Sequence, residues 1–298
     1  MALIPMMSQR ARSKLFDLAF ALWTGAFAPA VFVLWVLGSP EIAVRKTTRV
    51  WARGFLFLLR WIVGLTHVEC GRHNIPAVPC LIVANHQSTW ETVAFLTLFP
   101  DVAIVAKREL LTIPVFAWFL RNSPMILIDR ESGSTAVRKM VDESRAALDS
   151  GRSILIFPEG TRMDVSTPVK FKRGVELLYS RLGRVVLPVA LDSGQFWGPG
   201  QACKRGGVIT VSYLAPIEPG LPGAEFTRRT EELIETALAP TRPSETGSLA
   251  LADATPDAPL VENGGNPVKN EEAGALHVIA VGQQHVVIGE DVAHIRDQ

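Results

Sequence analysis

The sequence has few of the features that mark several common protein classes. Charged residues make up only 20% of its 298 residues, and its three cysteines, Cys70, Cys80 and Cys203, are scattered. Such spacing forms neither a disulfide framework nor a metal-binding pair, and it suits a reducing compartment. The chain lacks the HExxH motif of zinc hydrolases, and Ser88 lacks the GxSxG turn of serine hydrolases. These absences argue against secreted disulfide-rich proteins and against both hydrolase classes.

The chain is rich in apolar residues, and its charge is unevenly distributed. Hydrophobic residues make up 48% of the sequence, which is high for a soluble enzyme but too low for a multi-spanning membrane protein. Residues 241–298 contain three basic and nine acidic side chains, a net charge of −6. Since the whole chain has a net charge of +1, residues 1–240 have a net charge of +7. The body is therefore expected to favour a membrane or anionic substrates, and no feature predicts a nucleic-acid partner.

The N-terminal region contains one long apolar run. It covers residues 15–38 with a single charge, Asp17, and as a helix it could cross about 30 Å of hydrocarbon. It is too long for a signal peptide and has no clean cleavage site, so we expect it to be retained. Basic residues flank it on both sides, and Gly25 and Pro29 would permit a bend. A single membrane span and a shallow hairpin both fit.

The segment after this run predicts an amphipathic helix. At about 100° per residue, four arginines fall within one narrow sector while apolar side chains cover much of the rest. The arginines are Arg45, Arg49, Arg53 and Arg60, and the apolar residues are Trp51, Phe55, Leu58, Leu59 and Ile62. This pattern is typical of a helix lying on an anionic bilayer. A core helix with one solvated stripe has the same period, so both interpretations stand.

The central region alternates between short apolar runs and helix-like stretches. Strands are expected at 80–84, 102–106, 125–128, 153–157, 185–191 and 208–213, and helices around 87–98, 113–121, 132–149, 174–182 and 225–238. This alternation predicts an α/β fold with a largely parallel sheet and crossover helices. We therefore divide the chain into membrane-associated helices (1–65), a catalytic domain (66–240) and an acidic tail (241–298).

A His-x4-Glu pair follows the first of these expected strands. His86 could act as a general base, and Glu91 could hold the other ring nitrogen of the imidazole. Five residues separate the two by about 140° on an ideal helix, so they can meet only if His86 lies at or before the first turn. Asn85 is a candidate cap for that turn. Alone, the pair is weak evidence, because a structural or capping role explains it as well.

A second polar cluster, "FPEGTR" at residues 157–162, follows another expected strand. Its proline and glycine predict a tight turn that projects Glu159, Thr161 and Arg162 where no core needs them. Nearby cations suited to a phosphate are Lys107, Arg108, Arg130, Lys170, Lys172 and Arg173. In a parallel sheet the carboxyl ends of the strands meet at one edge, so these groups are expected to gather with His86.

The blocks "NHQSTWE", "KREL", "IDR", "FPEGTR" and "VLPVAL", in this order, resemble the glycerolipid acyltransferase superfamily, and most closely the bacterial 1-acyl-sn-glycerol-3-phosphate acyltransferases. The resemblance covers roughly residues 10–240. It implies acyl transfer from acyl-CoA or acyl-acyl carrier protein to lysophosphatidic acid, giving phosphatidic acid, with no metal or cofactor. It also implies a location at the inner, cytoplasmic membrane, with the catalytic domain facing the cytoplasm.

The resemblance further implies the roles of individual residues. His86 is the general base and Glu91 its partner, whereas the family pattern has Asp in place of Glu91. The implied substrate-binding residues are Glu159, Gly160, Thr161, Arg162, Lys107, Arg130 and Lys172. Two alternatives remain at this level: an acyltransferase for another lysolipid, such as a lyso-ornithine lipid, and a non-catalytic protein that binds anionic lipid at the membrane surface.

The C-terminal region predicts no function. From about Thr241 it is rich in Pro, Gly, Ala and acidic residues and is expected to be a disordered extension. Its three histidines, His277, His285 and His294, are spaced too irregularly to indicate a metal site.

Overall fold

A break at Phe27 divides the N-terminal apolar run into two helices in the computed structural model, which describes residues 7–112, 114–128 and 133–241. Helix α1 (Gln9–Ala26) begins at Ser8, whose side chain accepts a hydrogen bond from the Ala11 N–H. Helix α2 (Ala28–Val36) has a proline in its first turn, where a missing N–H costs nothing. The predicted tail (241–298) and Arg130 lie outside the described residues, apart from Thr241.

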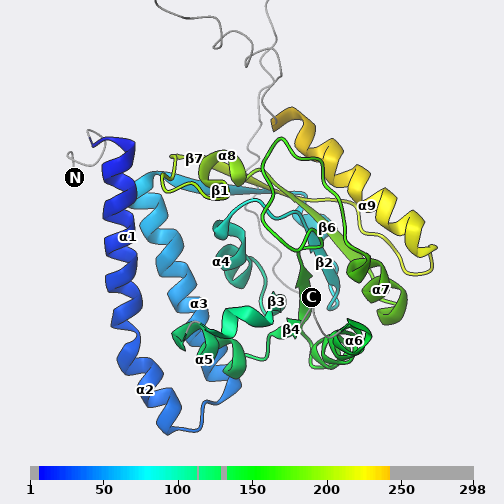
Figure 1. The fold of residues 1–298 in the computed structure, drawn as a ribbon, viewed down its shortest axis with the longest axis horizontal. Coiled ribbons are helices and arrows are strands. Elements are labelled where there is room, and N and C mark those ends of the chain that lie inside the picture. Colours follow the sequence, from blue (N-terminus) through cyan, green and yellow to red (C-terminus); the bar gives the residue numbers. More distant parts are fainter. Residues whose placement is uncertain (1–6, 113, 129–132, 242–298) are drawn as a thin grey trace, which may run out of the picture. The chain divides into compact units, whose positions relative to one another are not determined.

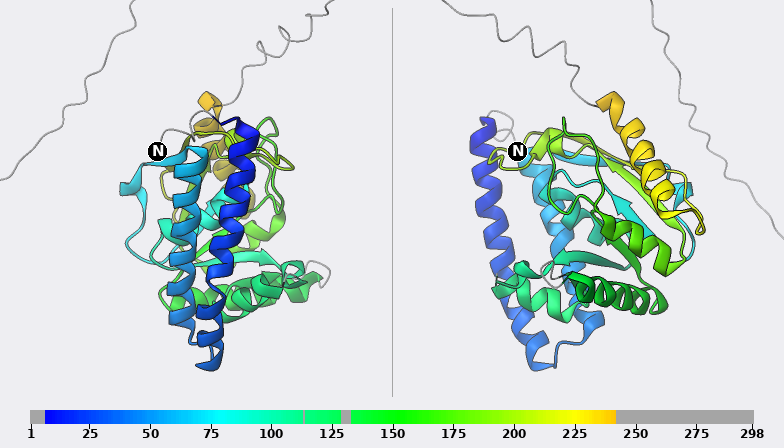
Figure 2. Two further views of the ribbon diagram at one scale, coloured as in Figure 1. Left: turned by 90° about the vertical axis from the view of Figure 1, so that its left-hand side faces the viewer. Right: turned by 45° about the vertical axis from the view of Figure 1, so that its right-hand side comes forward.

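Helix α3 (Glu41–Leu58) returns alongside α1, as Figure 2 shows. It continues as one π-helical turn (Leu59–Val63) and stops at Gly64, whose φ of 80° is a left-handed conformation that glycine adopts without strain. The long segment Gln9–Val36 is apolar enough to cross a membrane, but α1 and α3 both pack against the rest of the protein.

A seven-stranded sheet forms the centre of the described structure (Figure 1). Its strands are β1 (Leu65–Cys70), β2 (Leu81–Ala84), β3 (Val102–Lys107), β4 (Ile126–Ile128), β5 (Ser153–Ile156), β6 (Val186–Leu191) and β7 (Gly207–Tyr213). Their order is β1-β7-β6-β2-β5-β3-β4, and every neighbouring pair is parallel except β6 and β7. The expected α/β fold with a largely parallel sheet is confirmed.

The remaining helices cover the two faces of the sheet. Helices α4 (Thr89–Leu98), α1 and α3 lie on one face, and α6 (Gly133–Asp149), α7 (Arg173–Leu182) and α9 (Gly223–Leu238) lie on the other. Shorter helices are α5 (Pro114–Asn122), α8 (Gly194–Trp197) and 3-10 turns at Arg72–Asn74, Arg108–Thr112 and Ala239–Thr241. The helices turn apolar faces to the sheet, which leaves its loop edges for polar chemistry.

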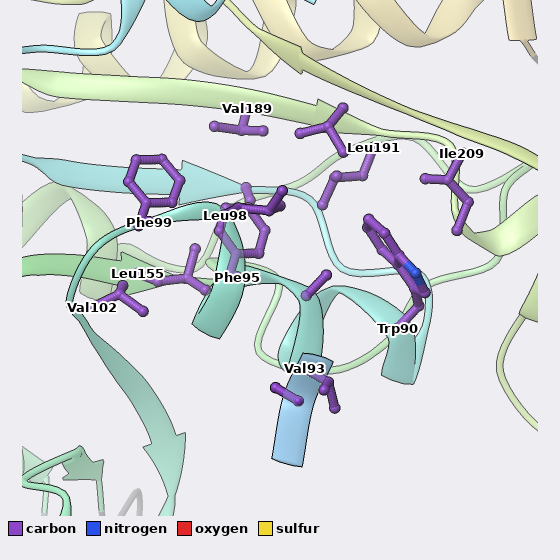
Figure 3. Close-up of a cluster of buried hydrophobic side chains, with 14 of the residues drawn as sticks. Trp90, Val93, Phe95, Leu98, Phe99, Val102, Leu155, Val189, Leu191 and Ile209 are labelled. Carbon is purple, nitrogen blue, oxygen red and sulfur yellow. The ribbon is translucent and has the colours of Figure 1, made fainter. Parts of the chain in front are cut away.

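The larger core lies between the sheet and the helices on the first face. Phe95 and Leu98 of α4 lie there with Leu155 of β5 and Val189 of β6 (Figure 3), and Phe16 of α1 belongs to the same cluster. Burying each such side chain contributes roughly 1.5–3 kcal/mol. The N-terminal helices and the sheet therefore share one core rather than meeting across a solvated boundary.

The sequence does not predict strand β1, because it is an edge strand. Along Leu65–Cys70 only Leu65 is buried and the other residues are partly or fully exposed, so the strand contains no continuous apolar run. The six predicted strands are all present, within one residue of their expected ends. Fully buried parallel strands leave a stronger signal in the sequence than a half-exposed edge strand does.

Helix α3 corrects part of the expected arginine stripe: Arg53 and Arg60 are exposed, but Arg45 and Arg49 are partly buried. Arg45 pairs with Asp101 at 3.1 Å, and Arg49 donates to the carbonyl of Pro100, so both arginines contact the protein. The predicted bilayer-facing side chains Phe55, Leu59 and Ile62 are buried in the core. The exposed apolar side chains of α3 and its π-helical turn are instead Ile42, Val50, Phe57 and Trp61. The alternative interpretation, a core helix, describes most of α3 better.

Candidate active site

Two adjacent parallel strands deliver the polar clusters to one place. Strand β2 pairs with β5, with Leu81 opposite Ile154 and Val83 opposite Ile156. Their carboxyl ends therefore lie side by side, and the residues that follow them, 85–88 and 157–162, meet at the same edge.

His86 and Glu91 are in contact at this edge. The Nδ1 atom of His86 lies 2.9 Å from Oε1 of Glu91. The contact forms because α4 begins at Thr89, so His86 precedes the helix and its ring folds back toward the first turn. The cap of this turn is Ser88, whose side chain accepts from the helix backbone while Glu91 accepts from the Ser88 N–H.

Asn85 was therefore wrongly expected to be the cap. Its side chain instead bonds the backbone of Leu191 twice: Nδ2 donates to the carbonyl at 2.8 Å, and Oδ1 accepts from the N–H at 2.8 Å. This pair of bonds joins the end of β2 to the end of β6, so Asn85 fixes the position from which His86 emerges.

Glu91 is completely buried and is held by four donors. Its Oε1 accepts from the backbone N–H groups of Gln87 (2.7 Å) and Ser88 (2.5 Å) as well as from His86. Its Oε2 accepts from the Ser193 hydroxyl at 2.8 Å. Both oxygens of Glu91 therefore serve as acceptors. With Glu91 as the acceptor, the proton of neutral His86 lies on Nδ1 and Nε2 is left as an acceptor.

The ring of His86 also rests on an aromatic side chain. Phe157, the residue after β5, stacks on it with 4.2 Å between ring centroids and 17° between planes. The His86 side chain remains 17% exposed, whereas Glu91 is inaccessible. Phe157 thus covers one face of the imidazole and Glu91 holds its Nδ1. The rest of the ring is open to solvent at the edge of the sheet.

Glu159 does not project from its turn as the sequence suggested. It is 4% exposed, and its Oε2 accepts from the backbone N–H of His86 at 2.7 Å. Burial raises the pKa of Glu159 to about 8, although the His86 N–H opposes this and the nearby Glu91 adds to it. The expectation failed because a polar residue in a tight turn usually faces solvent, whereas here the neighbouring loop covers it.

The rest of the turn is tied to the same loop. Gly160 adopts a φ of 73°, and the N–H of Met163 donates to the His86 carbonyl at 2.7 Å. Arg162 is exposed and donates from Nη1 to the Thr89 hydroxyl at 2.8 Å. Thr161 is exposed as well. An unburied guanidinium therefore stands beside the first residue of α4, three positions from His86.

Two further predicted cations, Lys172 and Lys107, follow or end elements at this edge. Lys172 is exposed at the start of α7, and its N–H donates to the carbonyl of Pro158 at 3.0 Å, which ties it to the turn. Lys107 ends β3, which is separated from β2 by β5, and its side chain is partly buried. Arg130 lies outside the described residues.

The structure adds Ser193 and Phe157, whose contacts with Glu91 and His86 the sequence did not predict. Ser193 comes two residues after β6, at the same edge of the sheet, and that position was the one available signal. In the part of the chain that the structure describes, no three His, Cys, Asp or Glu side chains converge as metal ligands. The site instead combines an imidazole, its carboxylate partner and exposed cations, an arrangement that suits proton abstraction beside an anionic group.

Comparisons with known proteins point to one family of acyltransferases. The acyltransferase family model matches residues 67–192. A 1-acyl-sn-glycerol-3-phosphate acyltransferase of Pseudomonas aeruginosa is 36% identical over 203 residues, covering 67% of this chain and 79% of that protein. The human beta form is 30% identical over 175 residues, covering 57% of this chain and 63% of that protein.

A solved structure shares the fold. The crystal structure of the 1-acyl-sn-glycerophosphate (LPA) acyltransferase from Thermotoga maritima matches with a TM-score of 0.65 and 22% identity, covering 80% of this chain and 100% of that chain. The fold and the sequence similarity over both blocks of the site together lead to one conclusion: this chain belongs to the 1-acyl-sn-glycerol-3-phosphate acyltransferase family.

Proposed function

We propose that this protein transfers an acyl group from an acyl thioester to the sn-2 hydroxyl of lysophosphatidic acid, forming phosphatidic acid. The observation that carries the proposal is the pairing of the partly exposed His86 with the buried Glu91, beside the exposed Arg162. A base next to a guanidinium fits an acceptor that holds a hydroxyl and a phosphate on neighbouring carbons.

The chemical step follows from the orientation of His86. Nε2 removes the proton of the acceptor hydroxyl as that oxygen attacks the thioester carbonyl, which forms a tetrahedral intermediate. Glu91 stabilises the imidazolium through Nδ1. The intermediate then collapses, the carbon–sulfur bond breaks, and the thiolate takes the proton from His86. The products are an ester and a thiol, and the base returns to its neutral form.

Phosphate recognition is assigned to the turn after β5 and its neighbours. Arg162, Thr161 and Gly160 present a guanidinium, a hydroxyl and a tight turn at the rim, and Lys172 and Lys107 supply further positive charge. Arg130 remains part of this proposal from the sequence alone. Glu159 contributes indirectly, because its carboxyl is buried and holds the backbone of His86.

The same site requires a membrane, because acceptor and product are lipids. We propose that the N-terminal helices form a hairpin within one leaflet rather than a span. Arg45, one turn into α3, pairs with Asp101, so the turn between α2 and α3 stays close to the catalytic region. A turn held there does not reach the opposite side of a bilayer. Apolar side chains for the leaflet are exposed at Leu18, Leu22, Phe32, Val33, Trp35, Val36, Leu37 and Ile42.

Cellular location and acyl donor follow from the chemistry. Acyl-CoA and acyl-acyl carrier protein are both cytosolic thioesters, so the catalytic region is proposed to lie on the cytoplasmic face of the inner membrane. Either carrier delivers the same reactive carbonyl, and the site described above needs no cofactor beyond it.

The test is acyl transfer by the purified, detergent-solubilised protein. Lysophosphatidic acid, lysophosphatidylcholine and lyso-ornithine lipid are compared as acceptors, each with acyl-CoA and acyl-acyl carrier protein. We expect turnover of lysophosphatidic acid that is lost in His86→Ala and kept in the matched control His73→Ala, an exposed histidine in a 3-10 turn. Turnover confined to a phosphate-free acceptor would overturn the substrate, and turnover unaffected by His86→Ala would overturn the base.

A labelling experiment tests the hairpin. A single cysteine is placed at Ser39, in the turn between α2 and α3, after the native cysteines are replaced by serine. In vesicles that expose the catalytic region, a membrane-impermeant maleimide is expected to modify Ser39→Cys without detergent. Modification only after the vesicles are dissolved would show that the segment crosses the bilayer.

A further inference from the structure

We propose that Ser193 is a positioning residue for the acyl transfer: its hydroxyl holds the second oxygen of Glu91 and thereby keeps the first oxygen on His86. This inference rests on the proposed function and names a residue from the loop after β6, which neither motif contains. Ser193 is completely buried and lies 102 positions after Glu91 in the sequence.

The hydrogen bonds of Glu91 divide between its two oxygens. All of the donors from its own loop, namely the backbone of Gln87 and Ser88 and the ring of His86, meet Oε1. The Ser193 hydroxyl is the donor that meets Oε2, at 2.8 Å. A carboxylate held at one oxygen can still rotate about its last bond, whereas a donor at each oxygen fixes its plane.

Ser193 is itself placed with little freedom. Strands β2 and β6 are parallel neighbours, with Val83 opposite Pro188, and Asn85 clamps both backbone groups of Leu191. One residue later, Oδ1 of Asp192 accepts from the Thr210 N–H at 2.7 Å, which ties the end of β6 to β7. The hydroxyl of Ser193 therefore comes from a backbone that is fixed on both sides.

The next residue shows how closely this loop approaches the dyad. The N–H of Gly194 donates to Oε1 of Gln87 at 3.3 Å. A Cβ on Gly194 would lie 2.8 Å from Cγ1 of Val165 and 2.9 Å from Cβ of Gln87, closer than van der Waals contact allows. The absence of a side chain at 194 is thus what lets the Ser193 loop lie against the loop of His86.

The extra methylene of Glu91 makes the hydrogen bond from Ser193 to Oε2 important. Compared with the aspartate of the family pattern, glutamate has one more rotatable bond and more ways to leave the histidine. Without the Ser193 hydroxyl, Oε2 would be a buried oxygen without a donor among the described residues, and such an oxygen favours conformations that reach another donor or water. His86 would then lose part of the partner that stabilises its imidazolium.

The first test is Ser193→Ala measured with lysophosphatidic acid and an acyl thioester. We expect kcat to fall roughly 10- to 100-fold, the range for one hydrogen bond to a charged group, while the KM for the acceptor stays within about twofold. Ser144→Ala is the matched control, since Ser144 is also completely buried and its hydroxyl makes no hydrogen bond in the described structure. An equal loss of kcat in both variants would overturn the proposal.

Two further measurements separate positioning from a general structural effect. In a Glu91→Ala background, the addition of Ser193→Ala is expected to lower kcat no further, because the serine acts through the glutamate. In protein labelled with 15N-histidine, the Nδ1–H proton of His86, assigned by its loss in His86→Ala, is expected to shift in Ser193→Ala and not in Ser144→Ala. This spectrum needs no turnover, so an unchanged resonance overturns the inference even if the protein acts on another substrate.

Discussion

The backbone N–H of His86 donates to the buried carboxyl of Glu159, with 2.7 Å between the nitrogen and Oε2. This bond joins the two motifs of the site through the main chain of one and the side chain of the other. Burial raises the pKa of Glu159 to about 8, so the group is largely protonated at neutral pH. A neutral carboxyl can accept the His86 N–H without placing a second negative charge near Glu91.

Glu159→Gln tests this arrangement through the pH dependence of stability. An acid whose pKa is higher in the folded state than in the unfolded state loses stability as pH rises from about 4.5 to about 8. Glutamine keeps the carbonyl acceptor and does not titrate. In thermal unfolding, the Tm of Glu159→Gln minus that of the wild type is therefore expected to grow from pH 5 to pH 8 and to level off above. A difference that stays constant over this range, as expected for the exposed control Glu225→Gln, would contradict the protonated state.

The length of the Glu91 side chain leads to a second prediction. Glu91 lies in the first turn of α4 and reaches back to His86 and across to Ser193 at the same time. Aspartate is shorter by one carbon–carbon bond and cannot satisfy both contacts without movement of the backbone. We expect Glu91→Asp to lower kcat at least about tenfold, which corresponds to the loss of one strong hydrogen bond in the transition state.

The control for this change is Glu225→Asp, an exposed glutamate in the first turn of α9, which should leave kcat unchanged. Initial rates at saturating donor and acceptor give kcat directly. Wild-type kcat in Glu91→Asp would show that the extra methylene has no role in this chain.

The sequence predicts the strands well because most of them are buried on both faces. Leu81–Ala84 and Val186–Leu191 are short apolar runs, and an apolar run of that length is the expected form of a parallel central strand. The edge strand Leu65–Cys70 has no such run, so the sequence does not predict it. The arginines of α3 mislead for a related reason, because periodicity shows that Arg45 and Arg49 share a face but not that Asp101 and Pro100 lie opposite it.

In the site, too, contacts between residues close in the sequence can be predicted and contacts between distant residues cannot. His86 and Glu91 are five residues apart, so helix geometry alone states the condition under which they can meet. Ser193 is separated from Glu91 by 102 residues, and only the order of strands in the sheet brings the two together. The sequence predicts the correct edge of the sheet for Glu159 but predicts an exposed side chain where the structure has a buried one. Burial of a turn residue depends on the loop that packs over it.

Arg162 is predicted to act on acceptor binding. It is exposed, and its one side-chain hydrogen bond in the described structure goes to the Thr89 hydroxyl, so its other donors are available to a phosphate. Arg162→Ala is expected to raise the KM for lysophosphatidic acid roughly 10- to 100-fold, the range for one charge-assisted pair, with a smaller effect on kcat.

Two comparisons make this prediction specific. Arg228→Ala removes an exposed arginine that pairs with Glu232 on α9, and it should leave the KM unchanged. The KM for the acyl thioester should also be unchanged in Arg162→Ala. A rise in the KM of the thioester alone would assign Arg162 to the donor instead.

The contact between α1 and the catalytic region includes a lysine that is almost fully buried. Nζ of Lys204 lies 2.7 Å from Oδ1 of Asp17 and sits over the ring of Trp197, with 4.7 Å to its centroid. The Lys204 side chain is 4% exposed and that of Asp17 is 58% exposed. The lysine therefore depends on its counter-charge, whereas the aspartate can be solvated without it.

This asymmetry predicts an order of stabilities. Asp17→Asn leaves the buried ammonium without a counter-charge and is expected to cost about 1–3 kcal/mol of unfolding free energy, less than a fully buried pair because Asp17 is half exposed. Lys204→Met keeps an unbranched chain against Trp197 and removes the charge, so it should cost less. Unfolding of the detergent-solubilised protein monitored by tryptophan fluorescence measures both. Glu232→Gln, which breaks an exposed pair with Arg228, should change the free energy by no more than about 0.5 kcal/mol. If Lys204→Met proves the more damaging change, packing of the lysine stem rather than its charge holds α1 in place.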